Sequence, residues 1–185
     1  MYIIYLYIDA FAPLRSLRHV DFFNNSLLIP AFLGFNGNVP PLLPATVNQI
    51  GLGSFRIIQQ IPYALITQSV TSINLSGNVY MKLTLTLFHS SLSALTTLVM
   101  ENCGISAIGL NAFNNLDKLL YLYLGKNPIT TISPNVFPRS LNLLSLFQEP
   151  ASQNSGSGRS QMPLLNFNLT GMSALTWLDM NLVNV

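Results

Sequence analysis

The chain has 185 residues, of which 50% are hydrophobic and only 8% are charged, and this length fits one domain with a sizeable core. A net charge of +2 from scattered Lys and Arg residues gives no basic surface for nucleic acid, and the single cysteine, Cys103, excludes an internal disulfide framework. No apolar run approaches the ~18 residues of a membrane span.

The first segment of the chain is a predicted strand. Residues 3–8 (IIYLYI) alternate in the same way as residues 119–124 (LLYLYL), and no basic residues precede them as they would in a secretory signal peptide. The next strand pattern begins at Leu17, too soon for a complete turn of chain. We therefore interpret residues 1–16 as a partial or degenerate repeat, with Phe11 and Leu14 at its end.

The first complete repeat shows the pattern L-x-x-L-x-L-x-x-N-x-L. It consists of Leu17, Val20, Phe22, Asn25 and Leu27. The alternation puts two side chains on one face of a short strand, and the asparagine turns the chain by bonding backbone groups of the bend. Residues 29–44 follow with four prolines, which predicts an irregular loop that bulges from the stack.

The second and third repeats differ in how well they keep this pattern. In the second repeat Phe55 stands where the asparagine is expected, so we predict that the hydrogen bond of that turn is lost. The third repeat is complete, with Val70, Ile73, Leu75, Asn78 and Tyr80.

The best-preserved stretch is residues 95–132, which holds two copies of the pattern offset by 24 residues. A fixed period of about 20–29 residues indicates a solenoid, in which each repeat covers the open core of its neighbour. Cys103 and Asn127 occupy the turn position, and Cys103 is predicted to be buried and inert. The return segments are too short for full helices, so we expect short 3₁₀ pieces, with Phe113 and Phe137 filling the core.

The C-terminal part is less regular. The sixth repeat, which starts at Leu141, puts Glu149 at the turn position, and residues 151–161 form a Ser/Gly-rich insertion that is expected to be flexible. Residues 162–185 hold a last partial repeat. No polar cap is visible at either end, although solenoids need caps for solubility, so we interpret the chain as a fragment of a longer protein.

The full pattern, L-x-x-L-x-L-x-x-N-x-I-x-x-I-x-x-x-x-F-x-x-L at a 24-residue step, resembles the typical class of leucine-rich repeats, most strongly over residues 70–146. The resemblance implies a single domain over residues 1–185 with its main repeats at 17–150. The implied fold is an α/β solenoid: a right-handed curved stack with a parallel β-sheet on the concave face and short 3₁₀ or irregular segments on the convex face. It also implies a module that binds a protein, or alternatively a glycan or lipid, without catalysis or cofactor.

The candidate binding site is the outward face of the strands. The x positions of each L-x-x-L-x-L unit point away from the core and line up across repeats. In the C-terminal half they include aromatic side chains, which dominate binding hot spots when exposed. The predicted partner-binding residues are Val99, Glu101, Tyr121, Tyr123, Lys126, Phe147, Trp177 and Asp179, and Ser145 and Gln148 are also predicted to face outward. The alternative is that the aromatic residues cover one another or pack on a neighbouring segment.

Catalytic chemistry is poorly supported. His19 and Asp21 lie two apart on one predicted strand, which predicts a hydrogen-bonded surface pair, and no Ser or Cys nucleophile lies near them. Asp21 and Asp179 would be more than ~20 Å apart at about 4.8 Å per strand, too far for a catalytic carboxylate pair. His89 is expected to be solvated on the convex side. Without a C-x-x-C, a phosphate loop or metal-ligand spacing, no catalytic residue, cofactor or metal site is predicted.

Three N-glycosylation sequons occur, at Asn24, Asn74 and Asn168. A glycan on Asn74 would block the middle of the predicted sheet and leave the C-terminal repeats for binding. The sequons and the low charge favour an extracellular or receptor-ectodomain setting. The lack of a signal-peptide pattern and of Cys-rich caps in this sequence argues against that setting.

Two other interpretations stay open. The chain could be the regulatory repeat segment of a larger receptor-like kinase, with a catalytic domain beyond Val185. It could also be a truncated or mispredicted gene fragment, as the short first step, the Pro-rich break and the uncapped ends suggest. A cooperative thermal unfolding transition would argue against the second of these.

Overall fold

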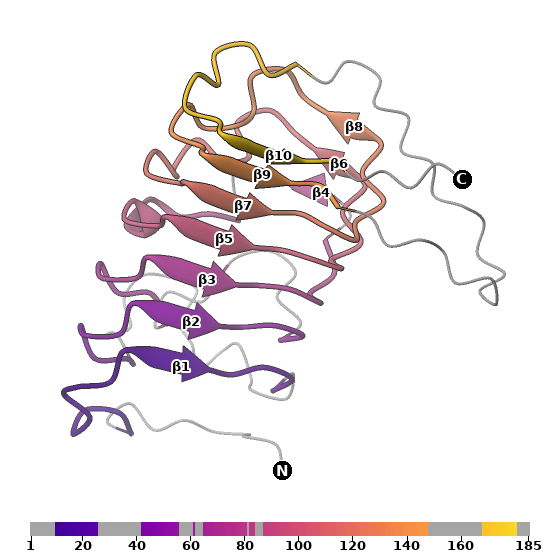
Figure 1. Cartoon of the computed structure of the whole chain (residues 1–185). Helices are drawn as coiled ribbons and strands as arrows, with labels where there is room; N and C mark the ends of the chain where they lie inside the picture. Colours follow the sequence, from indigo (N-terminus) through magenta and orange to yellow (C-terminus); the bar gives the residue numbers. More distant parts are fainter. Residues whose placement is uncertain are drawn as a thin grey trace, which may run out of the picture.

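The computed structural model describes residues 10–25, 42–55, 61, 65–80, 82–83, 87–147 and 168–180. Within them the chain winds as a coil in which each turn adds one strand to the same sheet (Figure 1). The predicted strand at residues 3–8, the predicted insertion at 151–161 and most of the predicted loop at 29–44 lie outside the described residues. The end of that loop returns to the core, because Leu42 and Leu43 are buried.

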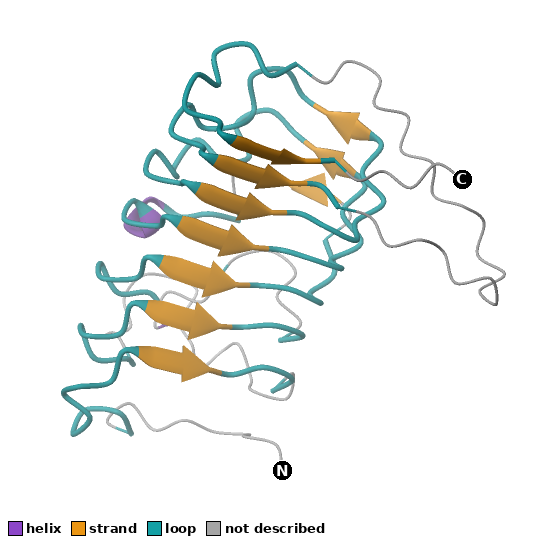
Figure 2. Ribbon diagram, viewed as in Figure 1, coloured by secondary structure: helices purple, strands orange, loops and turns teal. Residues whose placement is uncertain are grey.

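Seven short strands form the main sheet. They are β1 (His19–Asp21), β2 (Gln49–Gly51), β3 (Ser72–Asn74), β5 (Thr97–Val99), β7 (Tyr121–Tyr123), β9 (Leu143–Ser145) and β10 (Trp177–Asp179). All are parallel and follow one another in chain order, so they stand like the rungs of a ladder (Figure 2). The seven strands agree with the strand positions that the repeat pattern predicts for this part of the chain.

A second parallel sheet lies on the opposite side of the coil, and the sequence pattern did not predict it. Its strands are β4 (Lys82–Leu83), β6 (Ala107–Ile108) and β8 (Thr131–Ile132), in that order. These two-residue strands pair because the return segments repeat at steps of 25 and 24 residues, the same steps as those from β3 to β5 and from β5 to β7. One 3₁₀ helix, η3 (Ser90–Leu92), lies wholly within the described residues, where the helical part of the expected α/β class is therefore small.

The hydrophobic core fills the space between the two sheets. The middle residues of the first six main strands point inward and are at most 8% exposed. In β10 the corresponding residue, Leu178, is 40% exposed, because no described strand follows β10 in the sheet. Phe11 packs edge-on against Phe22, whereas Leu14, which we placed beside it at the end of a repeat, is 48% exposed.

The predicted core phenylalanines form a stack along the coil. Phe113 and Phe137 are buried as predicted, and their rings lie 6.0 Å apart at an interplanar angle of 17°. Phe88 extends the stack from the previous repeat, with its ring 5.8 Å from that of Phe113. Three successive repeats thus contribute one ring each to the same column, which fixes the spacing of their return segments.

Asn127 shows how the turn position holds two repeats together. Its side chain is fully buried, and its Oδ1 accepts the backbone N–H groups of Cys103 at 2.8 Å and Ile105 at 3.2 Å in the preceding repeat. Its Nδ2 donates to the carbonyl oxygens of Met100, Leu124 and Gly125 at 2.7, 2.8 and 3.2 Å. One amide therefore satisfies backbone groups that would otherwise be buried without partners.

Cys103 takes the same position one repeat earlier. Its thiol is 1% exposed and donates to the carbonyl of Leu75 at 3.3 Å and that of Glu101 at 3.4 Å. Burial raises the pKa of Cys103 to about 11, so at neutral pH it is a protonated, unreactive thiol. The prediction of a buried, inert cysteine in the turn row is confirmed.

Phe55 replaces the turn asparagine of the second repeat, and its side chain cannot make the hydrogen bonds that Asn127 makes, as predicted. The carbonyl of Leu52 in that turn accepts from Nδ2 of Asn78 at 2.8 Å, which is the bond that Asn127 makes to Met100 in the regular repeats. Phe55 itself is buried, and its ring centre lies 6.5 Å from that of Phe22. The phenylalanine therefore contributes apolar volume to the core in place of the turn hydrogen bonds.

Candidate binding face

The outward side of the seven-stranded sheet, here called the ladder face, carries its side chains in three rows. The pairing register sets the first row as His19, Gln49, Ser72, Thr97, Tyr121, Leu143 and Trp177, and the second as Asp21, Gly51, Asn74, Val99, Tyr123, Ser145 and Asp179. The third row, two residues further on, is Phe23, Gly53, Ser76, Glu101, Gly125 and Phe147. Neighbours within a row are one strand spacing apart, about 4.8 Å.

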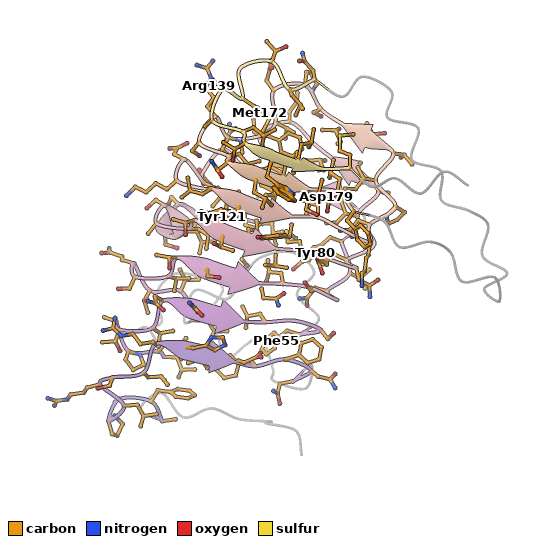
Figure 3. All side chains as sticks on the ribbon, in the orientation of Figure 1. Phe55, Tyr80, Tyr121, Arg139, Met172 and Asp179 are labelled. Atoms are coloured by element: carbon orange, nitrogen blue, oxygen red, sulfur yellow. The ribbon has the colours of Figure 1, made fainter. Side chains whose placement is uncertain are left out.

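The predicted partner-binding residues all lie on this face or on its rim. Trp177 and Tyr121 are 63% and 38% exposed. The half-buried members are Val99, Glu101, Tyr123, Phe147 and Asp179, and Lys126 is exposed on the rim. Figure 3 shows Tyr121 near the start of its strand and Asp179 near the end of β10. The structure therefore brings together residues that the sequence spreads over about 80 positions.

Ser145 is a correction to the predicted outward set. It occupies a second-row position but is only 7% exposed, and its hydroxyl donates to Oδ2 of Asp179 at 3.2 Å. The Asp179 carboxylate therefore already binds the Ser145 hydroxyl, which the sequence pattern predicted to be available to a partner. Gln148, predicted beside it, lies outside the described residues.

Gly125 in the third row is buried, and its neighbours leave little room for a side chain. A Cβ atom there would lie 3.0 Å from the carbonyl oxygen of Phe147, 3.6 Å from Oε1 of Glu101 and 3.7 Å from Cβ of Phe147. Tyr123 precedes the glycine by two residues and stands on the same face.

The two glycines of the β2 repeat are covered as well. A Cβ on Gly51 would collide with the Asp21 carboxylate, and a Cβ on Gly53 would lie 2.5 Å from a ring carbon of Phe23. Side chains from β1 therefore already cover both positions. Phe23 is 57% exposed and was not among the predicted binding residues, although it has the same row position as Phe147 and could have been found from it.

The histidines have structural roles that differ from those predicted. Nδ1 of His19 forms a hydrogen bond with Oε1 of Gln49 at 3.0 Å, and the Asp21 carboxylate accepts the backbone N–H of Phe23 at 2.9 Å. The prediction of a hydrogen-bonded His19–Asp21 pair is therefore wrong. Register explains this, because Gln49 stands directly opposite His19 in the parallel ladder.

His89 is half-buried instead of solvated, because its Nδ1 accepts the N–H of Ser91 at 3.1 Å and caps η3. Among the described residues, no group of three His, Cys, Asp or Glu side chains could hold a metal ion.

All three sequon asparagines are exposed. Oδ1 of Asn74 accepts the N–H of Ser76 at 2.9 Å, and Oδ1 of Asn168 accepts that of Thr170 at 2.8 Å. Asn24 lies on the rim with a φ of 60°. Each is accessible to a modifying enzyme, and glycosylation itself stays a prediction.

The fold and the repeat geometry define a class of protein. Residues 93–148 match the family model described as "Leucine rich repeat". Residues 93–148 are thus leucine-rich repeats, and the parallel ladder gives the described chain the fold of a leucine-rich-repeat solenoid. No curated protein matches the chain in sequence.

One solved structure shows the same fold at low sequence identity, and a second is less similar. The TLR13–ssRNA13 complex superimposes with a TM-score of 0.60 and 16% identity, covering 93% of this chain and 23% of the TLR13 chain. Human 5T4 (Wnt-activated inhibitory factor 1, trophoblast glycoprotein) gives a TM-score of 0.46 and 19% identity over 68% of this chain and 46% of 5T4. This chain thus spans about a quarter of the length of TLR13. In the described part of the chain, no helix is long and apolar enough to cross a bilayer.

Proposed function

We propose that this chain is an interaction module that binds a protein partner through the ladder face and performs no chemistry of its own. The observation that carries the proposal is a group of aromatic side chains on the C-terminal strands, here called the aromatic patch: Tyr121, Tyr123, Phe147 and Trp177. Two of them are well exposed, Tyr121 at 38% and Trp177 at 63%. Aromatic residues that stay exposed on a rigid surface are the type of side chain that anchors interfaces.

The scaffold under the patch supports this use. Tyr121, Leu143 and Trp177 follow one another in the first row, and Tyr123 stands in the second. The strands beneath them are paired on both sides, except for β10, and their inward residues belong to one core. Because the backbone is already fixed, binding costs little ordering entropy beyond that of the side chains.

The charges on the ladder face favour a protein over a nucleic acid. Its three acidic residues are Asp21, Glu101 and Asp179, and a phosphate backbone would need Lys or Arg in their place. The single-stranded RNA in the TLR13 complex belongs to that protein, and a likeness of 16% identity concerns the fold alone. A single-stranded RNA is therefore a control ligand for this chain, and we expect it not to bind the patch.

A glycan would direct partners toward the same region. Asn74 is exposed in the second row of β3, so a glycan there would cover the middle of the ladder face. Such a setting would be extracellular, as part of a larger receptor ectodomain. A repeat segment that regulates a receptor-like kinase is the second candidate. Expression through a secretory pathway, followed by mass measurement before and after deglycosylation, tests the setting, and an unchanged mass argues against it.

Site-specific photo-cross-linking tests the binding face itself. A photoreactive phenylalanine analogue is placed at Tyr121 or Trp177 on the ladder face. The matched controls are Val79 and Leu110, which are 68% and 63% exposed but lie outside the ladder face. The full chain is irradiated in extracts and in secreted fractions of the source cells, and adducts are identified by mass spectrometry.

The expected result is a discrete protein adduct from the ladder-face positions and none from the control positions. Equal labelling from Leu110 and Trp177 would contradict the proposal, because it would show adhesion without a preferred face. A partner found in this way should lose affinity with Tyr123→Ala and Phe147→Ala while far-UV circular dichroism stays unchanged. Unchanged affinity in both variants would also refute a role for the patch.

A further inference from the structure

We propose that the first row of the ladder face binds a proline-rich segment of the protein partner in the polyproline II conformation, with two prolines three residues apart resting on Tyr121 and Trp177. This inference rests on the proposed function, since it names the chemistry that the partner brings to the aromatic patch. Both anchor side chains reach solvent, because Tyr121 is 38% exposed and Trp177 is 63% exposed.

The spacing of the two aromatic residues along the row carries the proposal. Tyr121 pairs with Leu143 in the register of β7 and β9, and Leu143 pairs with Trp177 in the register of β9 and β10. Tyr121 and Trp177 are therefore two strands apart, which places their Cα atoms about 9.6 Å apart. A polyproline II helix has three residues per turn at about 3.1 Å each, so its equivalent residues recur every ~9.3 Å. A segment that lies across the strands therefore presents one proline to each ring.

Leu143 fits the middle of such a segment. It stands between the two aromatic residues in the same row, is half-buried, and has a shorter side chain than either neighbour. In a three-residue repeat, the two residues between the prolines project away from the sheet. Only the backbone of the segment therefore passes over Leu143, and the two residues between the prolines can vary.

The backbone under the row favours this conformation over an added β-strand. β7 and β9 are each hydrogen-bonded to a strand on either side, so neither offers a free backbone edge to an extended peptide. A polyproline II segment has no internal hydrogen bonds, and a proline has no N–H, so the segment presents carbonyl acceptors. The Tyr121 hydroxyl and the Trp177 indole N–H are donors that suit such carbonyls. The segment is also extended before it binds, which lowers the entropy cost of binding.

The charges on the ladder face favour a basic residue beside the prolines. Its three described rows hold Asp21, Glu101 and Asp179 but no Lys or Arg, and Lys126 is exposed on the rim beyond them. Asp179 follows Trp177 by two residues on β10, so the two side chains stand on the same face of the strand. An arginine next to the proline that rests on Trp177 would therefore meet an acidic group.

The test titrates the full chain with synthetic peptides and follows the fluorescence of Trp177, the only tryptophan in the chain. We expect L-nonaproline to bind with a Kd on the order of 1 mM or lower, and at least about tenfold more tightly than D-nonaproline, its mirror image. The peptide Ala-Pro-Ala-Ala-Pro-Ala should bind at least about threefold more tightly than Ala-Pro-Ala-Pro-Ala-Ala, which has the same composition but the wrong spacing. An arginine added to one end of nonaproline should tighten binding about threefold.

Four variants separate the contributions, with dye-labelled L-nonaproline and its anisotropy as the readout. Tyr121→Ala and Trp177→Ala should each weaken binding about tenfold, as expected for exposed aromatic anchors. Tyr121→Trp should keep the affinity within about twofold, because it retains a ring and a donor. Asp179→Asn should remove the advantage of the arginine-tagged peptide and leave the binding of nonaproline unchanged. Leu110→Ala is the matched control, because Leu110 is 63% exposed but lies outside the ladder face.

Several results would overturn the inference. They are equal affinity for the L- and D-peptides, equal affinity for the two proline spacings, or unchanged affinity in both alanine variants. A response of Trp177 to the glucose oligosaccharide cellotetraose with none to nonaproline would also overturn it, because it would assign the row to a glycan. Circular dichroism and thermal unfolding of each variant ensure that a lost signal is not lost folding. Cross-linking from Tyr121 and Trp177 is an independent readout, so failed peptide binding with intact cross-linking leaves the protein-binding proposal standing.

Discussion

Asn127→Ala is the substitution that most directly tests how the repeats are held together. It removes an amide that is fully buried and makes contacts in its own bend and in the preceding repeat. The backbone N–H groups of Cys103 and Ile105 lose their acceptor, and each unsatisfied buried donor costs about 1–3 kcal/mol. We expect a total loss of about 4 kcal/mol, a large part of the ~5–15 kcal/mol that stabilises a typical domain.

Urea unfolding followed by circular dichroism measures this loss. With a slope of about 2 kcal/mol/M, the midpoint should fall by about 2 M. Asn114→Ala is the control, since Asn114 is exposed and should change the free energy of unfolding by less than about 0.5 kcal/mol. Asn25→Ala should fall between the two, because the Asn25 amide is only half-buried and donates to Phe22 and Phe23 in its own bend. A loss below about 1 kcal/mol for Asn127→Ala would refute the idea that the turn amides join neighbouring repeats.

Three further predictions concern single side chains. Tyr80→Phe should raise the free energy of unfolding by about 1 kcal/mol in the same assay, because the Tyr80 hydroxyl is buried and no described residue hydrogen-bonds it. A loss of stability in this variant would contradict the prediction. Ser54→Gly should also raise the free energy of unfolding by about 1 kcal/mol, because Ser54 has a φ of 50°, a left-handed conformation that glycine adopts without strain. Ser93→Gly is the control at an exposed position and should not raise the free energy of unfolding. Cys103 has a folded pKa of about 11 against an ordinary value of 9.0, so the folded state retains its proton longer and stability should fall as pH rises from about 9 to 11. Cys103→Ala should lack this part of the fall, and an identical pH profile would show that the thiol does not contribute to it.

The row of left-handed residues explains why the strands end where they do. Asn24, Ser54, Gly77, Asn102 and Lys126 have φ values of 60°, 50°, 74°, 51° and 58° and occupy the same position after five successive strands. A left-handed residue turns the chain sharply, so each repeat leaves the ladder face at the same point. The third row lies immediately before this bend, which places Lys126 on the rim.

The sequence alone located most of the scaffold. Leu98, Leu122 and Leu144 could be assigned to the core because the alternation of a strand is a local property of the sequence and recurs in each repeat. The same holds for Asn127 and Phe113, whose positions follow from the 24-residue step. Local periodicity also placed the aromatic patch on one face, since outward residues alternate with core residues on the same strand.

Only the tertiary structure decided which outward side chains touch. His19 meets Gln49 and Ser145 meets Asp179, pairs that are 30 and 34 residues apart because insertions interrupt the regular step. The position of the Glu101 carboxylate beside Gly125 likewise depends on the conformation of the Glu101 side chain, which the sequence periodicity does not specify. The repeated pattern sets the pairing register of the strands, and this register sets which residues form the core. The contacts on the ladder face depend instead on the particular residues that lie side by side in that register, and these residues differ from repeat to repeat.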